Sequence, residues 1–346
     1  MASPPHALSS AQVSAALGRA ARWNIPEILF WLVAVGAYFA LPTRHLILNE
    51  IAILGLFAVS LDLILGYAGI VSLGHAAFFG LGAYTAGLLA KHGFGDPLLG
   101  LAAAAAMAAA LGLVTSFLVL RGADLTKLMV TLGVALVLGE VANQMSWLTG
   151  GADGLQGVNM KPVLGLFEFD IFGSVAYAYS LAVTFVLVVV ARRIVSSPFG
   201  LSLRSIRDNP LRARAIGIPV NRRLVAVYTL SAAYAGIAGA LLAQTTQFVS
   251  LEVLAFHRSA DVLLVLTIGG VGYLYGGLIG AVVFKVLQDF LSAITPQYWQ
   301  FWIGVILVVM VLAGRERMTE KARDLVRRVT GRGRPTSGAA PAAGGH

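Results

Sequence analysis

Apolar residues in this chain come in long runs that recur from one end of the sequence to the other, separated by short polar stretches. Most runs approach the length of about 17–25 residues that a helix needs to cross the hydrocarbon core of a membrane. The pattern predicts an all-α, polytopic bundle of transmembrane helices. We delimit ten apolar segments: 26–42, 46–66, 70–90, 98–120, 127–148, 173–191, 224–247, 260–273, 276–291 and 299–313.

The eighth and ninth segments depend on how residues 260–291 are divided. Taken as one helix, this stretch is too long for an untilted span. Glycine weakens a helix interior, so several glycines in one stretch favour a break. We therefore predict two crossings here, and ten in total, because the stretch is interrupted by Gly269, Gly270, Gly272, Gly276 and Gly277.

The basic residues indicate which side each loop faces. Most of them lie in two blocks, Arg192–Arg223 and Arg315–Arg334. Lys and Arg mark the cytoplasmic side of membrane proteins, so an even number of crossings must separate the two blocks. The ten-segment division meets this condition. It places the loops at 149–172 and 248–259 outside.

The sequence accordingly divides into three parts. Residues 1–24 are expected to form a cytoplasmic N-terminal segment. Residues 25–313 are expected to form the transmembrane domain, with a cytoplasmic loop at 192–223. Residues 314–346 are expected to form a basic, partly disordered tail, also cytoplasmic.

Composition supports a membrane protein throughout. Hydrophobic residues make up 58% of the chain and charged residues 12%, whereas a soluble domain has about 25% charged residues. The net charge of +9 is not accompanied by a basic face with interleaved aromatic residues, so no nucleic-acid binding is expected. The absence of cysteine excludes disulfides and cysteine-ligated metals. We predict no catalytic residue and no metal site.

Two glycine-rich stretches indicate an internal duplication. GYAGIVSLGHAAFFGLG spans Gly66–Gly82, and GGVGYLYGGLIG spans Gly269–Gly280. Each begins near the third segment of a five-segment half, 26–148 or 173–313. Because five is odd, the two halves would be inverted in the membrane, as in transporters whose interrupted helices frame a pathway. The alternative is that glycine and alanine only allow close helix packing.

Polar residues inside the apolar runs are further candidates for a pathway. A charge at the bilayer centre costs about 2.5–3.5 kcal/mol, so it is expected to face protein or water. Glu140 and Asn143 are one turn apart and share a helix face, and Lys285 and Asp289 are interpreted as a structural ion pair. For His75, helix packing and a place on the path are both open. The candidate pathway residues are Gly74, His75, Glu140, Asn143, Gly276 and Gly277.

The cytoplasmic loop at 196–219, SSPFGLSLRSIRDNPLRARAIGIP, carries signals of ordered structure. Residues 200–208 suit a short helix. Asn209 and Pro210 form a helix start, with Asn as N-cap and Pro at the first position, and Gly217 is placed to end that helix. A loop that only connects two spans needs no helix caps and no residue placed to end a helix. We therefore predict that this loop is a docking element. The alternative is a basic loop that serves only orientation and lipid headgroups.

Together, these motifs resemble those of the branched-chain amino-acid ABC transporter permease family, specifically its M-type subunit. The resemblance extends over residues 46–313. It implies a second permease subunit, two cytoplasmic ATPase subunits and a periplasmic or extracellular substrate-binding protein, around a chain embedded in the lipid of the bacterial inner membrane with both termini in the cytoplasm. The resemblance is carried by LDLILGYAGIVSLGHAAFFGLGAYTAGLL at 61–89, SPFGLSLRSIRDNPLRARAIGI at 197–218, LTIGGVGYLYGGLIGA at 266–281 and LTGGADGLQGV at 148–158.

The resemblance also implies that residues near 200–217 form coupling helices that seat in the ATPase subunits. The segment RGADLTK at 121–127 departs from the more aromatic form expected in the family. The substrate therefore stays open among branched-chain or other apolar amino acids, urea, short amides and aromatic carboxylates. The matching coupling positions are Ser197, Pro198, Gly200, Arg204, Arg207, Asp208, Asn209, Pro210 and Gly217.

The chain contains no G-x-x-x-x-G-K-[ST] loop, whose backbone amides cradle nucleotide phosphates. We therefore expect no cofactor on this chain, no enzymatic activity of its own, and ATP hydrolysis on partner subunits. The leading interpretation is a permease subunit of an ATP-driven amino-acid importer. A stand-alone secondary transporter or channel and a non-transporting membrane scaffold are the alternatives.

Overall fold

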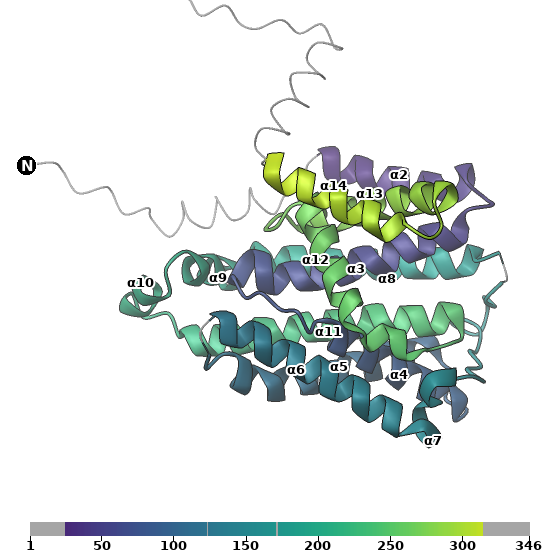
Figure 1. The fold of residues 1–346 in the computed structure, drawn as a ribbon, viewed down its shortest axis with the longest axis horizontal. Coiled ribbons are helices and arrows are strands. Elements are labelled where there is room, and N and C mark those ends of the chain that lie inside the picture. The colour runs from purple at the N-terminus through teal and green to yellow at the C-terminus, as the bar shows by residue number, and fades with distance from the viewer. Residues whose placement is uncertain (1–24, 123, 171, 314–346) are drawn as a thin grey trace, which may run out of the picture. The chain divides into compact units, whose positions relative to one another are not determined.

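The computed structural model describes residues 25–122, 124–170 and 172–313, which Figure 1 shows as a ribbon. The predicted cytoplasmic segments 1–24 and 314–346 lie outside the described residues. The chain divides into two units, the first ending at Val286 and the second beginning at Leu287.

The described residues are nearly all helical, and each of the ten predicted segments corresponds to one helix. In order, these helices are α2 (Ile25–Ala40), α3 (His45–Ala68), α4 (Ala76–Lys91), α5 (Pro97–Val119), α6 (Asp124–Gln144), α8 (Ser174–Val195), α11 (Val220–Thr246), α12 (Phe256–Gly269), α13 (Leu274–Ile294) and α14 (Trp299–Ala313). The short elements between them are α7 (Ser146–Thr149), η1 (Gly151–Asp153), α9 (Pro198–Asp208), α10 (Pro210–Ala215) and η2 (Leu251–Leu254). The predicted all-α membrane bundle is confirmed.

Six of the described helices are long and apolar enough to cross a membrane: α3, α5, α6 from Leu125, α8, α11 and α13. The helices α2, α4, α12 and α14 are shorter, at 16, 16, 14 and 15 residues. Two of these short helices, α4 and α12, adjoin segments that are not helical. Residues 69–75 precede α4, and residues 270–273 follow α12. The count of ten crossings stays a prediction.

The helix break predicted within residues 260–291 is present. One helix ends at Gly269 and the next begins at Leu274. Between them, Gly270 has a φ of 110° and Gly272 a φ of 79°. A side chain at such φ values is strained, so glycine is what allows the chain to turn here.

The two glycine-rich stretches do not hold matching places in the two halves. Gly66–Gly82 covers the end of α3 and the start of α4, the second and third segments of the first half. Gly269–Gly280 covers the end of α12 and the start of α13, the third and fourth segments of the second half. The glycines therefore give the inverted repeat no support, and it stays a prediction.

The core of the first unit is built around α3 and α11. α3 is the most enclosed of the six long apolar helices, with 83% of its apolar window buried, and it packs against α8, α11 and α12. α11 packs against α3, α4 and α5. Lipid provides no hydrophobic driving force for helices to associate, so the helices depend on close packing. Small residues permit this packing because they let two helix backbones approach each other. A Cβ atom added to Gly82 on α4 would overlap the backbone of Gly236 on α11.

The short elements lie at opposite ends of the bundle (Figure 1). α9 and α10 lie at one end, and α7 lies at the other. At the α7 end, the α6–α8 and α11–α12 connections are joined by an isolated antiparallel bridge, in which Leu155 N–H donates to Val249 O at 2.7 Å. The two loops expected outside therefore lie together, far from the loop expected inside. Which end faces the cytoplasm stays a prediction.

Replacing Gly82 by alanine should destabilise the bundle, because the added Cβ has no space against the α11 backbone. We expect a loss of about 1–3 kcal/mol, as in other overpacked cores. The matched control is Gly133→Ala on α6, where an added Cβ meets nothing within 4 Å. Thermal melting of the detergent-purified variants should show a lower Tm for G82A alone. Equal Tm values would show that α4 and α11 are not in backbone contact.

Candidate functional site

The helix pair α9–α10 begins and ends as its sequence predicts. Ser197 Oγ accepts a hydrogen bond from Phe199 N–H at 3.2 Å, and Pro198 is the first residue of α9. Asn209 Oδ1 accepts from Arg212 N–H at 2.9 Å and caps α10, whose first residue is Pro210. Each side-chain cap satisfies a backbone donor that the helix itself leaves without a partner. The chain leaves α10 through Gly217, whose φ is 86°.

The two short helices are packed against the bundle and against each other. Ile206 on α9, Ala213 on α10 and Val220 at the start of α11 form one buried apolar cluster. Leu203 is also buried. Gly200 lies so close to the end of α8 that an added Cβ would overlap the backbone of Val195. The pair is therefore a fixed part of the fold, as the docking-element interpretation requires.

Arg207 joins α9 to the end of α3. The carbonyls of Ile64 and Leu65 accept hydrogen bonds from Ile70 and Gly69 N–H groups, as in a Schellman motif. The next carbonyl, that of Gly66, accepts from Arg207 Nη1. A cation at this place also complements the negative end of the helix dipole. The neighbouring arginine contributes to the same contact, since the Arg204 guanidinium lies 5.2 Å from the centre of the Tyr67 ring.

The same junction includes the break between α12 and α13. Gly272 N–H donates to Oδ1 of the buried Asp62 on α3 at 2.7 Å. Arg207 lies close enough to Asp62 to act on it electrostatically, and a Cβ added to Gly272 would lie 3.3 Å from Arg207 Nη1. One arginine of the α9–α10 loop thus hydrogen-bonds the end of α3 and lies beside the glycine break. We call this contact of Arg207, Gly66, Asp62 and Gly272 the α3 junction.

The coupling residues predicted from the sequence divide into inward and outward groups. Arg204 and Arg207 lie against α3, although 40% of the Arg207 side chain is exposed. Asp208 is largely exposed, with Oδ1 3.4 Å from Arg207 Nη2. Their contact with an ATPase stays a prediction. Sequence reasoning missed two exposed apolar side chains of this loop, Leu211 (74% exposed) and Ile216 (69%).

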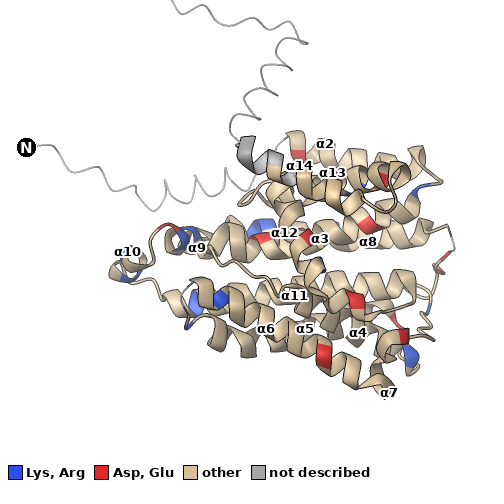
Figure 2. Ribbon diagram, in the orientation of Figure 1, with Lys and Arg blue, Asp and Glu red and all other residues tan. Residues whose placement is uncertain are grey.

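Large apolar residues set among arginines, in a loop outside the membrane spans, were the signal that could have identified Leu211 and Ile216. Figure 2 shows basic residues at the end of the bundle that carries α9 and α10. Exposed apolar side chains set among basic residues mark a contact surface, for a protein or for the membrane surface.

The pathway candidates Gly74 and His75 lie in packed protein. Gly74 fits against α6, where an added Cβ would overlap the carbonyl of Thr131. His75 is fully buried, with Nε2 2.8 Å from Ser60 Oγ and its ring stacked on Phe57 at 5.5 Å. These contacts match the helix-packing interpretation of His75. A role on the path stays a prediction for both residues.

The other two glycine candidates also make close packing contacts. A Cβ added to Gly277 would lie 3.0 Å from Ala58 on α3, and one added to Gly276 would overlap the carbonyl of Gly270. The three candidate glycines therefore do not share one packing partner. Gly74 packs on α6, whereas Gly277 packs on α3. Their place on a transport path stays a prediction.

Glu140 and Asn143 are both exposed on α6 within this chain, and their place on a transport path stays a prediction. Glu140 Oε1 accepts from Gln144 Nε2 at 2.7 Å. Glu140 also lines a cavity of about 220 Å³ between α6 and the η2–α12 segment, beside Leu136 and Phe256. A charged side chain on an apolar helix needs protein or water beside it. This surface therefore suits a subunit contact or an aqueous path.

The ion pair expected between Lys285 and Asp289 has a different partner. Lys285 Nζ lies 2.6 Å from Glu50 Oε2 on α3. The interaction therefore ties α13 to α3 and does not only stabilise α13 along its own length. The sequence analysis expected Asp289 because it lies four residues from Lys285 on one helix. Tertiary packing instead brings Glu50 of α3 beside Lys285.

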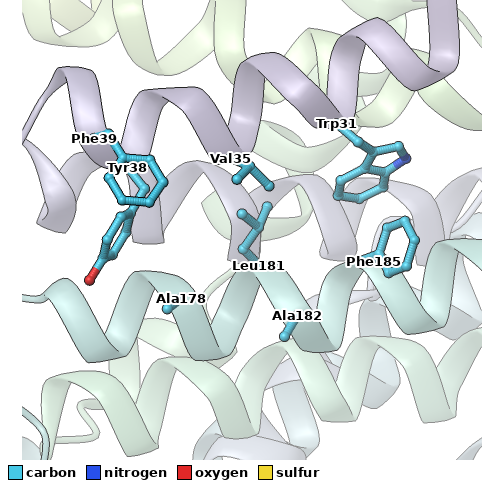
Figure 3. A pocket seen from close by; sticks show the side chains of 8 residues that line it. All are labelled: Trp31, Val35, Tyr38, Phe39, Ala178, Leu181, Ala182 and Phe185. Carbon is cyan, nitrogen blue, oxygen red and sulfur yellow. The ribbon is translucent and has the colours of Figure 1, made fainter.

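A groove of about 420 Å³ lies between α2 and α8 (Figure 3). Its walls are aromatic and aliphatic, with Trp31 and Val35 on α2 facing Leu181 and Phe185 on α8. The Trp31 indole N–H is used elsewhere, in a hydrogen bond of 3.2 Å to the Tyr275 hydroxyl. A zwitterion would lose its hydration here without replacement, so this groove is a poor site for an amino acid.

A comparison with models of known protein families assigns the chain to a family. Residues 44–311 match the family model described as branched-chain amino acid transport system / permease component. The chain belongs to this family. The permease is therefore a multi-pass membrane transport component, and the resemblance expected from its motifs is confirmed.

The names of individual relatives refer to different kinds of substrate. The permease is 29% identical over 284 residues to the high-affinity branched-chain amino acid transport system permease protein LivM of Escherichia coli K12, covering 74% of this chain and 65% of that one. It is 25% identical over 300 residues to the fructose import permease protein FrcC of Rhizobium meliloti, covering 82% and 81%. It is 29% identical over 296 residues to the autoinducer 2 import system permease protein LsrC of Yersinia pseudotuberculosis, covering 81% and 79%. No solved structure is significantly similar to the chain.

Replacing Arg207 by glutamine should loosen α9 from the bundle, because the Gly66 carbonyl and the Asp62 carboxylate lose their cation. A hydrogen bond to a charged group contributes about 1.5–3 kcal/mol, so opening of α9 should become about ten- to a hundredfold more frequent. Hydrogen–deuterium exchange of the α9 amides measures this directly. Arg212→Gln, on the exposed face of α10, is the control. Equal α9 exchange in both variants would contradict the α3 junction.

Proposed function

We propose that the permease is a membrane subunit of an ATP-driven importer and that it transports amino acids, of the branched-chain or another apolar type. The observation that carries this proposal is the capped helix pair α9–α10, packed onto α3 beside the helix break at Gly272. A stand-alone secondary transporter has no need of a rigid element of this kind outside its spans. The name of the Escherichia coli relative supports an amino-acid substrate.

In the proposed mechanism, α10 is seated in a cytoplasmic ATPase subunit through Leu211 and Ile216. Closure of the ATPase dimer on ATP moves α10, and the buried cluster of Ile206, Ala213 and Val220 carries α9 with it. Arg207 then transmits the displacement to the end of α3 and to Gly272. A packed interior transmits such a movement because it does not deform continuously.

The proposed assembly contains two ATPase subunits, a second permease subunit and an external substrate-binding protein. α6 supports the second permease, because only 17% of its apolar window is buried within this chain and Glu140 is exposed on it. The connections joined at Leu155 and Val249 lie at the end where the binding protein would deliver substrate. We place α9 and α10 in the cytoplasm and the chain in the bacterial inner membrane, with both termini cytoplasmic.

Leucine uptake should depend on the whole importer. Proteoliposomes that contain the permease, its partner permease and the ATPases should accumulate labelled leucine only with ATP inside and binding protein outside. Fructose in hundredfold excess should not compete. Competition by fructose would assign the substrate to the sugar class of relatives, and gradient-driven uptake without ATPases would favour a secondary transporter.

Replacing Leu211 by aspartate should remove the ATPase subunits from the complex. A buried, unpaired carboxylate at an interface costs several kcal/mol, enough to separate subunits at cellular concentrations. The matched control is Leu166→Asp, an equally exposed leucine (78%) in the connection at the opposite end of the bundle. Co-purification of the ATPases on a tagged permease gives the readout. Full retention with L211D would exclude α10 as the docking helix.

A further inference from the structure

A groove of about 630 Å³ opens between α5 and α11. It lies at the end of the bundle that carries α9 and α10, because α11 begins only a few residues after α10 ends. The coupling mechanism proposed above does not use the residues of this groove.

The groove has an apolar wall and a basic rim. Leu113 and Phe117 on α5 are 43% and 58% exposed, and they face Val225 on α11 across the groove. At the rim, Arg121 follows the end of α5 and Arg222 lies in the first turn of α11, and both are exposed. Within the described ranges neither arginine has an ion-pair partner.

Two further features add to the polarity of the α11 side. The N-terminus of α11 has no side-chain cap, and its first turn supplies Asn221 and Arg222 to the groove, so the positive end of the α11 dipole lies beside the rim. Two helical turns beyond Arg222 along α11, Thr229 Oγ1 is buried and has no hydrogen-bond partner among the described residues. The groove therefore offers positive charge at its rim and an apolar channel beyond the rim, toward the membrane interior.

We propose that this groove binds one anionic phospholipid of the cytoplasmic leaflet. The phosphate lies between Arg121 and Arg222, and an acyl chain follows Leu113, Phe117 and Val225. Basic sites between helices on the cytoplasmic side attract anionic headgroups, which a zwitterionic lipid satisfies less well. An acidic protein segment would meet the two arginines but would leave the apolar channel empty. The proposal uses the sidedness given under the proposed function.

A lipid bound here would brace the start of α11 against α5. Because α11 begins at Val220, a member of the buried cluster with Ile206 and Ala213, the lipid would hold one wall against which α10 moves. The cytoplasmic leaflet would thereby contribute to the rigidity that coupling needs.

Native mass spectrometry of the purified importer complex tests the proposal. After exchange into detergent with phosphatidylglycerol or phosphatidylcholine, the wild type should retain one phosphatidylglycerol per permease and much less phosphatidylcholine. Arg121→Gln/Arg222→Gln should lower phosphatidylglycerol affinity about thirtyfold, since each basic residue near an anionic surface contributes about 1 kcal/mol. Ala226→Trp, which fills the apolar channel and keeps the charge, should also lower it.

The control is Arg193→Gln/Arg214→Gln, which removes two exposed charges from the same end of the bundle but outside the groove. It should bind phosphatidylglycerol as the wild type does. Equal lipid retention by the R121Q/R222Q variant would overturn the proposal, and so would equal retention of the two lipids by the wild type. Loss of ATPase subunits from R121Q/R222Q with unchanged lipid would assign the arginines to a protein contact instead.

Discussion

The hydrogen bond from Arg207 to the last turn of α3 is the interaction on which the proposed coupling mechanism depends. It satisfies a helix-terminal carbonyl that no backbone group reaches, and it places a cation beside the buried Asp62. Asp62 in turn accepts from the backbone of Gly272. Because a buried polar group without a partner costs about 1–3 kcal/mol, none of the three elements can move away alone without loss. The α9–α10 loop, the enclosed helix and the glycine break therefore behave as one unit.

The position of α3 determines how far a movement at this junction extends. α3 contacts α8, α11 and α12, and Lys285 pairs with Glu50 near its other end. A shift of α3 therefore affects neighbouring helices along its whole length. The glycine contacts between α4 and α11 leave no free space there, so those helices are expected to move together. The lipid groove lies at the start of α11 and would restrain the same assembly from its outer side.

Local signals were readable in the sequence, whereas distant contacts were not. The length of the apolar runs predicted the helices, and Asn209, Pro210 and Gly217 predicted the boundaries of α10, because caps and stops depend on neighbouring residues. Arg207 and Gly66 are 141 residues apart, and no local pattern pairs them. The pair of Lys285 and Glu50 could not be predicted for the same reason, because the two residues are 235 positions apart in the sequence. The exposed Leu211 and Ile216 were visible in the sequence but were overlooked beside the arginines.

The ratio of substrate transported to ATP hydrolysed tests the central claim most directly. It should be measured in proteoliposomes of the complete importer for Arg207→Gln and for Arg193→Gln, an exposed arginine at the same end of the bundle. We expect R207Q to assemble and hydrolyse ATP while its transport per ATP falls at least tenfold, because the motion of α10 no longer reaches α3. R193Q should keep the wild-type ratio. An unchanged ratio in R207Q would contradict the α3 junction as the route of coupling.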